Sequence, residues 1–300
     1  MQYTWKNNKK EMTIKRFLVE CGVSHRLLRQ IKQGEGTVVL DEQQVPLATP
    51  IAKGEEIMLR LPPENHPEVP AATGELTILL ENSNWLVVAK PAGMTSVPGP
   101  SNRTTTLVNY VKGYLLNNQE EDLVPHIITR LDRFTSGAVL IAKNRLAQGL
   151  VNKQVEGKML EKQYLAVIKG QLPRRHGVIE QPIGREDQQI KRKVMAKGQY
   201  AKTEYWVLSA NDEASLLKLK LHTGRTHQIR VHLAYVGHPL VGDELYGGEK
   251  QALIARQALH AYTIGYTDPF TRRVQKVTAP LPLEMQKLCN KFTLDLTSIE

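Results

Sequence analysis

The chain has 300 residues, a length that indicates about two domains. Hydrophobic residues make up 41% and charged residues 23%, as in an ordinary globular protein. The formal net charge of +10 suits a polyanionic partner. The sequence lacks an apolar run of the roughly 20 residues that a membrane helix needs, and its first dozen residues do not resemble a signal peptide. Two cysteines, Cys21 and Cys289, exclude a disulfide framework and a cysteine-based zinc site, so we expect a cytoplasmic protein.

The first 60 residues predict two short helices followed by two strands. Thr13 is a suitable N-cap for the first helix, and Ser24 is a suitable N-cap for the second. Strand signals follow at 37–40 and 56–61. Residues 1–36 carry eight basic and three acidic side chains, which is half of the net charge of the chain. A charged helical face is more often solvated than bound, so this charge alone does not establish a binding surface.

A proline-rich stretch at 62–74 separates this segment from the rest of the chain. Its four prolines remove backbone donors and favour extended chain, which is typical of a linker. We therefore predict a small module at 1–62, a linker at 63–74 and one large domain at 75–300.

The large domain contains more predicted strands than helices. Apolar β-type runs lie at 77–81, 85–90, 137–143, 163–170, 204–210 and 215–223. Helical patterns lie at 106–118, 145–157, 226–237 and 281–292. Because the two kinds of element do not alternate regularly, we predict an α+β fold built on a mainly antiparallel mixed sheet, flanked by helices and loops.

Two segments combine residue types that can carry chemistry. In TRLDRFTSG (129–137), Asp132 stands between two arginines before a turn, where a neighbouring guanidinium can keep a carboxylate ionised. In the second segment, a helix predicted to start at Thr226 places Arg230 beside apolar neighbours. A half-buried arginine needs an anionic partner, and Asp132 is the candidate. Taken alone, the motif favours the simpler interpretation that Asp132 is a surface carboxylate in weak local ion pairs.

The histidines do not predict a metal centre. His227 and His232 are five residues apart, so on a helix they point about 140° away from each other. Phosphate loops, nucleophile elbows and the common zinc motifs are also absent from the sequence. We therefore expect neither a metal nor another cofactor.

The order of elements in residues 1–62 resembles the small RNA-binding module of a small-subunit ribosomal protein and of bacterial tyrosyl-tRNA synthetase. The resemblance rests on the second helix with the turn IKQGEG after it, and on the final strand KGEEIMLRL. It implies that this helix and turn lie on structured RNA. The residues that it would direct at phosphates are Ser24, His25, Arg26, Arg29, Lys32 and Gln33.

The large domain resembles the RluA/RluD family of RNA pseudouridine synthases. The motifs that carry the resemblance are WLVVAKPAGMTSVPG (85–99), TRLDRFTSG (129–137), EKQYLAV (161–167), AKTEYWV (201–207), TGRTHQIRVHLAYVGHPLVGDELYG (223–247) and LHAYTIGYTDP (259–269). The resemblance implies the pseudouridine synthase fold and the isomerisation of uridine within an RNA chain. This isomerisation transfers no electrons, which agrees with the expectation that no cofactor is needed.

The resemblance also implies roles for single residues. Asp132 would be the essential group, acting on the ribose as a nucleophile or as a base. Arg230 would pair with Asp132, and Tyr164 would stack on the target uracil. Arg130 would fill the space that the flipped nucleotide leaves.

Further basic residues would contact the RNA. Arg225 and His227 would bind phosphate or support the site. The segment 184–202, which includes Lys191, Arg192 and Lys193, is interpreted as a loop that grips the RNA backbone, with a solvated hairpin as the alternative.

Large-subunit ribosomal RNA is the expected substrate, because family members with such an N-terminal module mostly act there, and transfer RNA is the alternative. Two other functions stay open. One is a catalytically silent RNA chaperone or assembly factor on the same fold, and the other is a nucleobase hydrolase in which Asp132 activates water. We infer no protein partner and expect a monomer.

Overall fold

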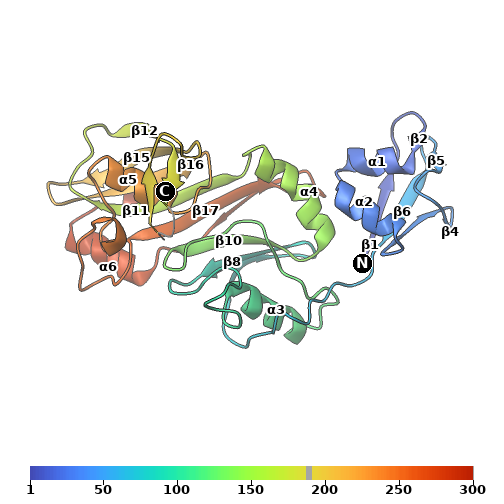
Figure 1. The fold of residues 1–300 in the computed structure, drawn as a ribbon, viewed down its shortest axis with the longest axis horizontal. Coiled ribbons are helices and arrows are strands. Elements are labelled where there is room, and N and C mark those ends of the chain that lie inside the picture. The colour runs from blue at the N-terminus through green and yellow to red at the C-terminus, as the bar shows by residue number, and fades with distance from the viewer. Residues whose placement is uncertain (187–190, 300) are drawn as a thin grey trace.

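The computed structural model describes residues 1–186 and 191–299, whose main elements are a four-stranded and a ten-stranded sheet (Figure 1). The smaller sheet has the strand order β1-β6-β3-β4. The larger sheet has the order β12-β15-β16-β11-β17-β10-β8-β7, with β18 beside β17 and β9 beside β10. Within these two ranges, no helix is long and apolar enough to cross a membrane.

Residues 1–61 form what we term the N-terminal unit. Its elements are β1 (Gln2–Lys6), β2 (Met12–Thr13), α1 (Ile14–Cys21), α2 (His25–Lys32), β3 (Thr37–Leu40), β4 (Gln43–Gln44), β5 (Pro50–Ile51) and β6 (Glu56–Arg60). Both predicted N-caps are confirmed, since the Thr13 hydroxyl accepts a hydrogen bond from the Arg16 amide and the Ser24 hydroxyl accepts one from the Leu27 amide. Strand β1 was not predicted, because it is held by pairing with β6 rather than by its local sequence.

The N-terminal unit shares a hydrophobic core with the rest of the molecule. Ile14 and Leu18 of α1 cluster with Leu146 and Leu150 of α4 (Arg145–Glu156), and all four side chains are buried. Figure 1 shows the unit beside the end of α4. Removal of the unit would therefore expose apolar surface on α4, a cost of about 25 cal/mol per Å² of that surface.

The remaining elements build the large sheet and its cover. They are β7 (Thr77–Glu81), β8 (Trp85–Lys90), α3 (Leu107–Asn117), β9 (His126–Ile127), β10 (Ser136–Ala142), α4, β11 (Glu161–Lys169), β12 (His176–Glu180), β13 (Ile183–Arg185), β14 (Arg192–Val194), β15 (Lys202–Ala210), β16 (Ala214–Leu221), α5 (Gln228–Tyr235), β17 (Leu259–Thr267), β18 (Val274–Thr278) and α6 (Leu283–Lys291). Short 3₁₀ helices lie at Glu244–Tyr246 and Thr297–Ile299.

The predicted α+β character and the mainly antiparallel sheet are confirmed. Among the described strands of the large sheet, β10 and β17 run parallel through Ser136 and Gly137, and the other pairs run antiparallel. The predicted start of the fifth helix at Thr226 was wrong by two residues. His227 adopts a left-handed conformation with φ 58°, which delays the helix until Gln228.

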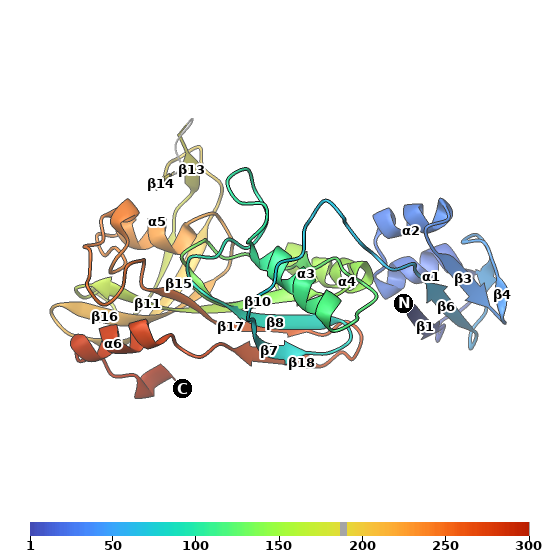
Figure 2. The same ribbon diagram turned by 90° about the horizontal axis from the view of Figure 1, so that it is seen from below.

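Successive residues of the central strands point to opposite faces of the sheet, and each face is covered by a helix. Tyr164 and Ala166 of β11 belong to the core beneath α5, whereas Val167 belongs to the core beneath α6. Figure 2 shows these two helices on opposite sides of the sheet. Tyr164 therefore lies on the α5 side.

Residues 61–76, which the structure describes throughout, contain neither helix nor strand but are fixed along α3. The ammonium of Lys112 donates to the carbonyl oxygens of His66 and Val69, at 2.7 and 2.8 Å. A Cβ at Gly113 would lie 2.0 Å from the carbonyl oxygen of Ala72, so the close approach of this segment requires glycine. The segment that was predicted as a linker is therefore tied to α3 along its length.

Candidate active site

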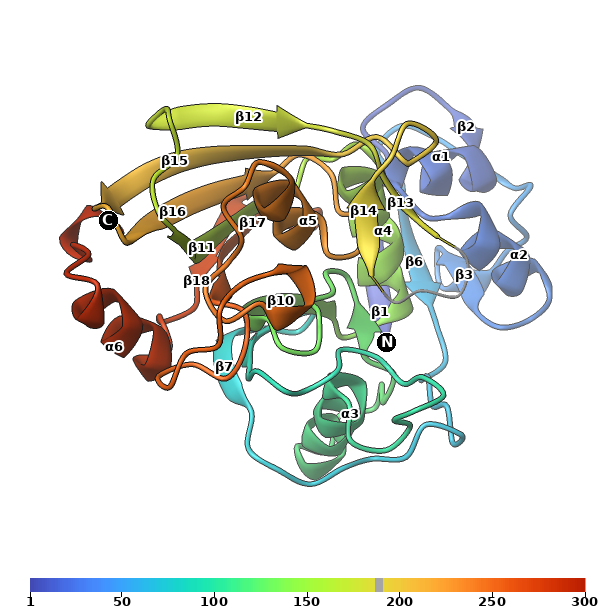
Figure 3. The same cartoon turned by 60° about the vertical axis from the view of Figure 1, so that its left-hand side comes forward.

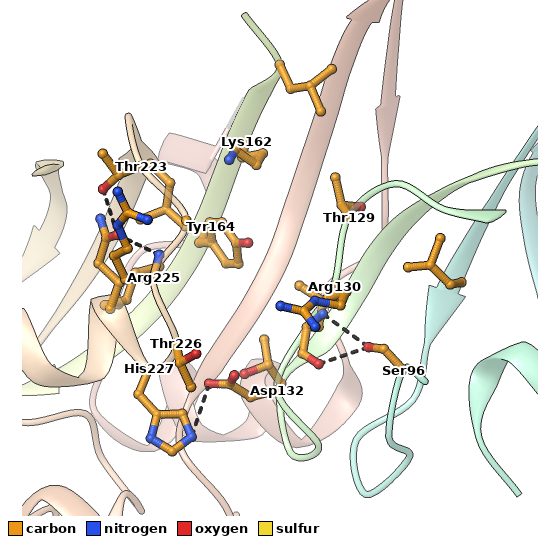
Figure 4. A pocket seen from close by; sticks show the side chains of 18 of the residues that line it. Ser96, Thr129, Arg130, Asp132, Lys162, Tyr164, Thr223, Arg225, Thr226 and His227 are labelled. Atoms are coloured by element: carbon orange, nitrogen blue, oxygen red, sulfur yellow. Dashed lines mark hydrogen bonds and ion pairs between the residues drawn. The ribbon is translucent and has the colours of Figure 1, made fainter. Parts of the chain in front are cut away.

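A pocket of about 720 Å³ opens on the α5 side of the large sheet. Residues from the loop between β9 and β10, from strand β11 and from the turn before α5 line its walls (Figure 4). The structure brings together at this pocket six of the residues singled out in the sequence, namely Arg130, Asp132, Tyr164, Arg225, His227 and Arg230.

Asp132 stands on the loop between β9 and β10, with its side chain 28% exposed. The hydroxyl of Ser96 bonds both the amide and the carbonyl of Leu131, at 3.1 and 2.9 Å. The ammonium of Lys90 donates to the carbonyl of Arg133 at 3.2 Å and to two carbonyls of its own loop, those of Pro91 and Met94. Two neighbouring side chains therefore fix the backbone on either side of the carboxylate.

Burial lowers the pKa of Lys90 to about 7, and the charge of Arg256 acts in the same direction, while Asp132 opposes the shift. Lys90 is only 1% exposed. The three carbonyl acceptors satisfy its donors, which a buried ammonium or amine requires. Lys90 therefore acts as a structural link between the two loops.

Arg230 lies between two carboxylates, and the nearer one was not predicted. Its Nε and Nη2 atoms donate to the two oxygens of Asp243, each at 2.7 Å, whereas its Nη1 lies 3.9 Å from Asp132 Oδ2. Burial acts to lower the pKa of Arg230, but the bonds to Asp243 outweigh it and raise the pKa. The predicted ion pair of Arg230 with Asp132 is present, but the closer partner is the buried Asp243, which forms a bidentate pair with one edge of the guanidinium.

His227 contacts Asp132 from the other side. Its Nε2 lies 4.0 Å from Asp132 Oδ2, and its Nδ1 lies 2.8 Å from the hydroxyl oxygen of Tyr246. That oxygen accepts a hydrogen bond from the backbone amide of Arg192 at 2.9 Å. The hydroxyl can donate its own hydrogen to Nδ1, and in the tautomer that accepts it the ring hydrogen of a neutral His227 lies on Nε2, facing the carboxylate. Burial lowers the pKa of His227, which favours this neutral form.

Tyr164 and Arg130 lie on opposite walls of the pocket (Figure 4). Tyr164 is 8% exposed, and burial together with the charge of Asp132 raises the pKa of its phenol. It is therefore a neutral hydrogen-bond donor and a flat apolar surface, both suited to a heterocyclic base. Arg130 is exposed and lines the pocket.

The other predicted RNA-contacting residues lie at different distances from the pocket. Arg225 lines it, with its Nε bonded to the carbonyl of Tyr200 at 3.0 Å. Strands β13 and β14 form a hairpin that Figure 3 shows beside α5. Lys191 lies over the ring of Tyr246 and Lys193 pairs with Glu186, while residues 187–190 of the same predicted loop lie outside the described residues.

Arg26, Arg29 and Lys32 are exposed on α2 in the N-terminal unit and do not line the pocket. Arg29 and Lys32 instead border a second cavity of about 1010 Å³, between α2 and the segment 44–48. Any contact that they make with a ligand is therefore separate from the pocket that holds Asp132.

Sequence reasoning missed three residues of the site: Lys162, Asp243 and Tyr246. Lys162 precedes Tyr164 by two positions on a strand, and that spacing alone could have indicated a second side chain in the pocket. Asp243 and Tyr246 lie at the two ends of the short 3₁₀ helix after α5, where no hydrophobic periodicity indicates which way the side chains point. Within residues 1–186 and 191–299, no group of three histidine, cysteine or acidic side chains could hold a metal ion.

The arrangement places one carboxylate, Asp132, in a largely basic pocket. Asp132 is oriented by a guanidinium and an imidazole and remains open to the pocket. Arg130, Arg133, Lys158, Lys162 and Arg225 supply positive charge around it. Such a pocket suits an anionic ligand with a planar ring.

Comparisons with known proteins agree with this description. A family model for RNA pseudouridylate synthase matches residues 84–235. The uncharacterized RNA pseudouridine synthase YjbO of Bacillus subtilis is 37% identical over 279 residues, which cover 92% of this chain and 98% of that protein. Ribosomal large subunit pseudouridine synthase D of Xanthomonas campestris pv. campestris is 32% identical over 286 residues, covering 90% and 85% of the two chains.

A solved structure shares the fold. Human RNA pseudouridylate synthase domain containing 4 superposes with a TM-score of 0.62 at 20% identity, covering 73% of this chain and 94% of that one. This likeness concerns the fold, while the sequence matches show the family. The chain belongs to the RNA pseudouridine synthases, which are isomerases that modify RNA.

Proposed function

We propose that this enzyme converts a uridine of large-subunit ribosomal RNA to pseudouridine, with Asp132 as the essential carboxylate. The observation that carries the mechanism is the placement of Asp132 in a pocket that also contains the buried ring of Tyr164. The choice of RNA is supported by relatives named ribosomal large subunit pseudouridine synthase D. A cytoplasmic location and a monomeric state stay predictions.

The reaction breaks the bond between the ribose C1′ and uracil N1 and forms a bond between C1′ and uracil C5. The proton on C5 is lost and N1 gains one, so the product is an isomer of the substrate. Asp132 either attacks C1′ or removes a ribose proton, and both roles need an ionised carboxylate close to the sugar. Asp132 Oδ2 lies 3.9 Å from Nη1 of Arg230 and 4.0 Å from Nε2 of His227, so both groups are placed to hold the carboxylate in position.

The target nucleotide has to leave its stack to enter the pocket. Flipping costs a few kcal/mol, and stacking of the uracil on Tyr164 offsets part of this cost. Arg130, on the opposite wall, would occupy the space that the nucleotide vacates. The basic rim and the β13–β14 hairpin would then hold the flanking phosphates.

The proposal is tested by mapping pseudouridines across cellular RNA with and without the gene product. The expected result is the loss of one or a few sites in large-subunit ribosomal RNA, restored by the wild-type gene. Loss of sites only in transfer RNA would contradict the proposed substrate while leaving the chemistry in place. Release of free uracil from RNA by the purified protein would contradict the isomerisation itself.

The basic face of α2 is proposed to bind structured RNA. Replacement of Arg26, Arg29 and Lys32 together by glutamine should weaken binding to a large ribosomal RNA fragment by at least about tenfold and reduce the slope of log affinity against log salt by about 2–3, because up to three phosphate contacts are lost. The rate on a short RNA should not change, since these residues lie outside the pocket. Filter binding at several salt concentrations measures both effects.

A matched control replaces Lys9 and Arg16, whose charges are already paired with Glu20 on the same unit. This control should change the salt slope less than the α2 variant does. Charge replacement is preferable to deletion of the unit, because deletion would expose Leu146 and Leu150. If the two variants weaken RNA binding equally, the α2 residues contribute only through the overall positive charge of the unit, and the proposed binding surface is contradicted.

The Tyr246 hydroxyl is proposed to keep His227 neutral. The variant Tyr246→Phe removes the donor to Nδ1 but retains the ring beneath Arg230, whose Cζ lies 4.8 Å from the ring centroid. The pKa of His227 should therefore rise, and the acidic limb of the pH–rate profile should move to higher pH. If Tyr246→Phe lowers the rate at every pH without shifting the acidic limb, the Tyr246 hydroxyl does not control the protonation of His227 and the residue contributes by packing only.

A further inference from the structure

Lys162 is a cation in the pocket whose charge has no opposite charge beside it. Among the residues that the structure describes, its ammonium forms neither an ion pair nor a hydrogen bond. Several buried cations among the described residues do have partners. Lys143 pairs with Glu81 and Glu120, and Arg256 pairs with Glu284, while Lys90 and Lys112 donate to backbone carbonyls. A half-buried charge of this kind is unfavourable until an anion joins it.

The surroundings of Lys162 are poorly hydrated and open on one side. Burial lowers the pKa of Lys162, with no charged neighbour among the causes of the shift. Gly224 faces the ammonium, since a Cβ at that position would lie 3.6 Å from Nζ. The turn before α5 therefore leaves room next to the charge instead of covering it with a side chain.

Lys162 and Tyr164 reach the pocket from the same strand. Both line it, while Gln163 between them does not, in agreement with the alternation of side chains along β11. Two residues along a strand span about 6.6 Å. A group stacked on Tyr164 and a group bound by Lys162 would therefore be parts of one nucleotide, separated by about the width of its sugar.

We propose that Lys162 binds a phosphodiester group of the target nucleotide or of its immediate neighbour. The proposal rests on the proposed function, because it assumes that Tyr164 receives the uracil. A phosphodiester is favoured over a uracil carbonyl because only a full negative charge compensates a desolvated ammonium. The nucleotide would thus be fixed at two points of β11, the base on Tyr164 and the phosphate on Lys162.

The test is a binding cycle between protein and RNA variants. The probe is a fluorescein-labelled RNA of 12 nucleotides with a single central uridine, in which one linkage at a time is replaced by a neutral methylphosphonate. Fluorescence anisotropy gives the affinity of each RNA for the wild-type chain, Lys162→Met, Lys162→Arg and the control Lys169→Met. Lys169 lies at the far end of the same strand, exposed and paired with Glu249.

For unmodified RNA, Lys162→Met should bind at least about tenfold more weakly, and its salt slope should be smaller by about 0.7, the value for one contact to single-stranded RNA. At one linkage next to the uridine, the methylphosphonate should weaken the wild type but not Lys162→Met. Lys162→Arg should keep most of the affinity and the sensitivity to that linkage. Lys169→Met should behave as the wild type.

The proposal would be overturned if the effects of Lys162→Met and of the methylphosphonate on affinity were additive at every linkage. An unchanged salt slope of Lys162→Met combined with a lower turnover would also overturn it, because the lysine would then contact the base and not a phosphate. The cycle needs binding only, so it is separable from the proposed function. If the wild-type enzyme modifies RNA but no linkage is coupled to Lys162, only the proposed role of Lys162 is refuted. Coupling without any modification of RNA refutes the proposed reaction but not the phosphate contact. Thermal unfolding should show that Lys162→Met is folded, because the variant removes an unpaired buried charge.

Discussion

Replacement of Asp132 by asparagine should lower turnover by roughly three orders of magnitude or more, while the affinity for RNA stays within a few fold. Asparagine keeps the shape of the side chain but neither attacks a sugar carbon nor accepts a proton. The carboxylate makes only long contacts, 3.9 Å to Arg230 and 4.0 Å to His227, so little binding energy is lost with its charge. The folded state should also be nearly as stable as that of the wild type.

Tritium release from RNA labelled at uracil C5 measures the rate, and anisotropy with the same RNA measures the affinity. Asp212→Asn is a matched control, because Asp212 is exposed at a surface turn and bonds Gln171. Its rate should equal that of the wild type. Undiminished tritium release by Asp132→Asn would remove this carboxylate from the mechanism.

Replacement of Asp243 by alanine should destabilise the protein by about 3–5 kcal/mol, the usual cost of leaving one member of a buried ion pair without its partner. The side chains of Arg230 and Asp243 are 9% and 1% exposed, so water replaces the lost bonds poorly. The freed guanidinium would turn toward Asp132, and turnover should fall along with stability. Urea unfolding and tritium release measure the two effects.

A double variant separates the structural from the catalytic contribution of this pair. Arg230→Met with Asp243→Leu removes both charges, so stability should return to near the wild-type value. Turnover should stay low, because Asp132 has then lost the guanidinium beside it. Recovery of activity in the double variant would show that Arg230 has no part in orienting Asp132.

Local signals in the sequence predict much of the fold. The caps at Thr13 and Ser24 act within one helical turn, and the alternation of Leu217 and Leu219 with charged residues acts within one strand. Long-range pairing is different in kind. The parallel contact between β10 and β17 joins residues more than 120 positions apart, and nothing in either segment indicates its partner.

In the candidate site, too, residues within recognisable motifs were predicted, whereas contacts set by tertiary packing were not. Its central residues were predicted because whole motifs resemble a family, and the pocket collects Asp132, Tyr164 and Arg230. The closer partner of Arg230, Asp243, was not predicted. It directly precedes the short 3₁₀ helix Glu244–Tyr246, in a segment whose direction is set by tertiary packing. The left-handed backbone of His227 was also not predicted, because residues other than glycine rarely adopt it, even though histidine is among the types enriched there.

The hydrogen bond from position 192 to the Tyr246 hydroxyl comes from the backbone, not from a side chain. Any amino acid except proline at position 192 can supply this donor. The side chain at position 192 can thus change without loss of the hydrogen bond that holds the Tyr246 hydroxyl beside His227.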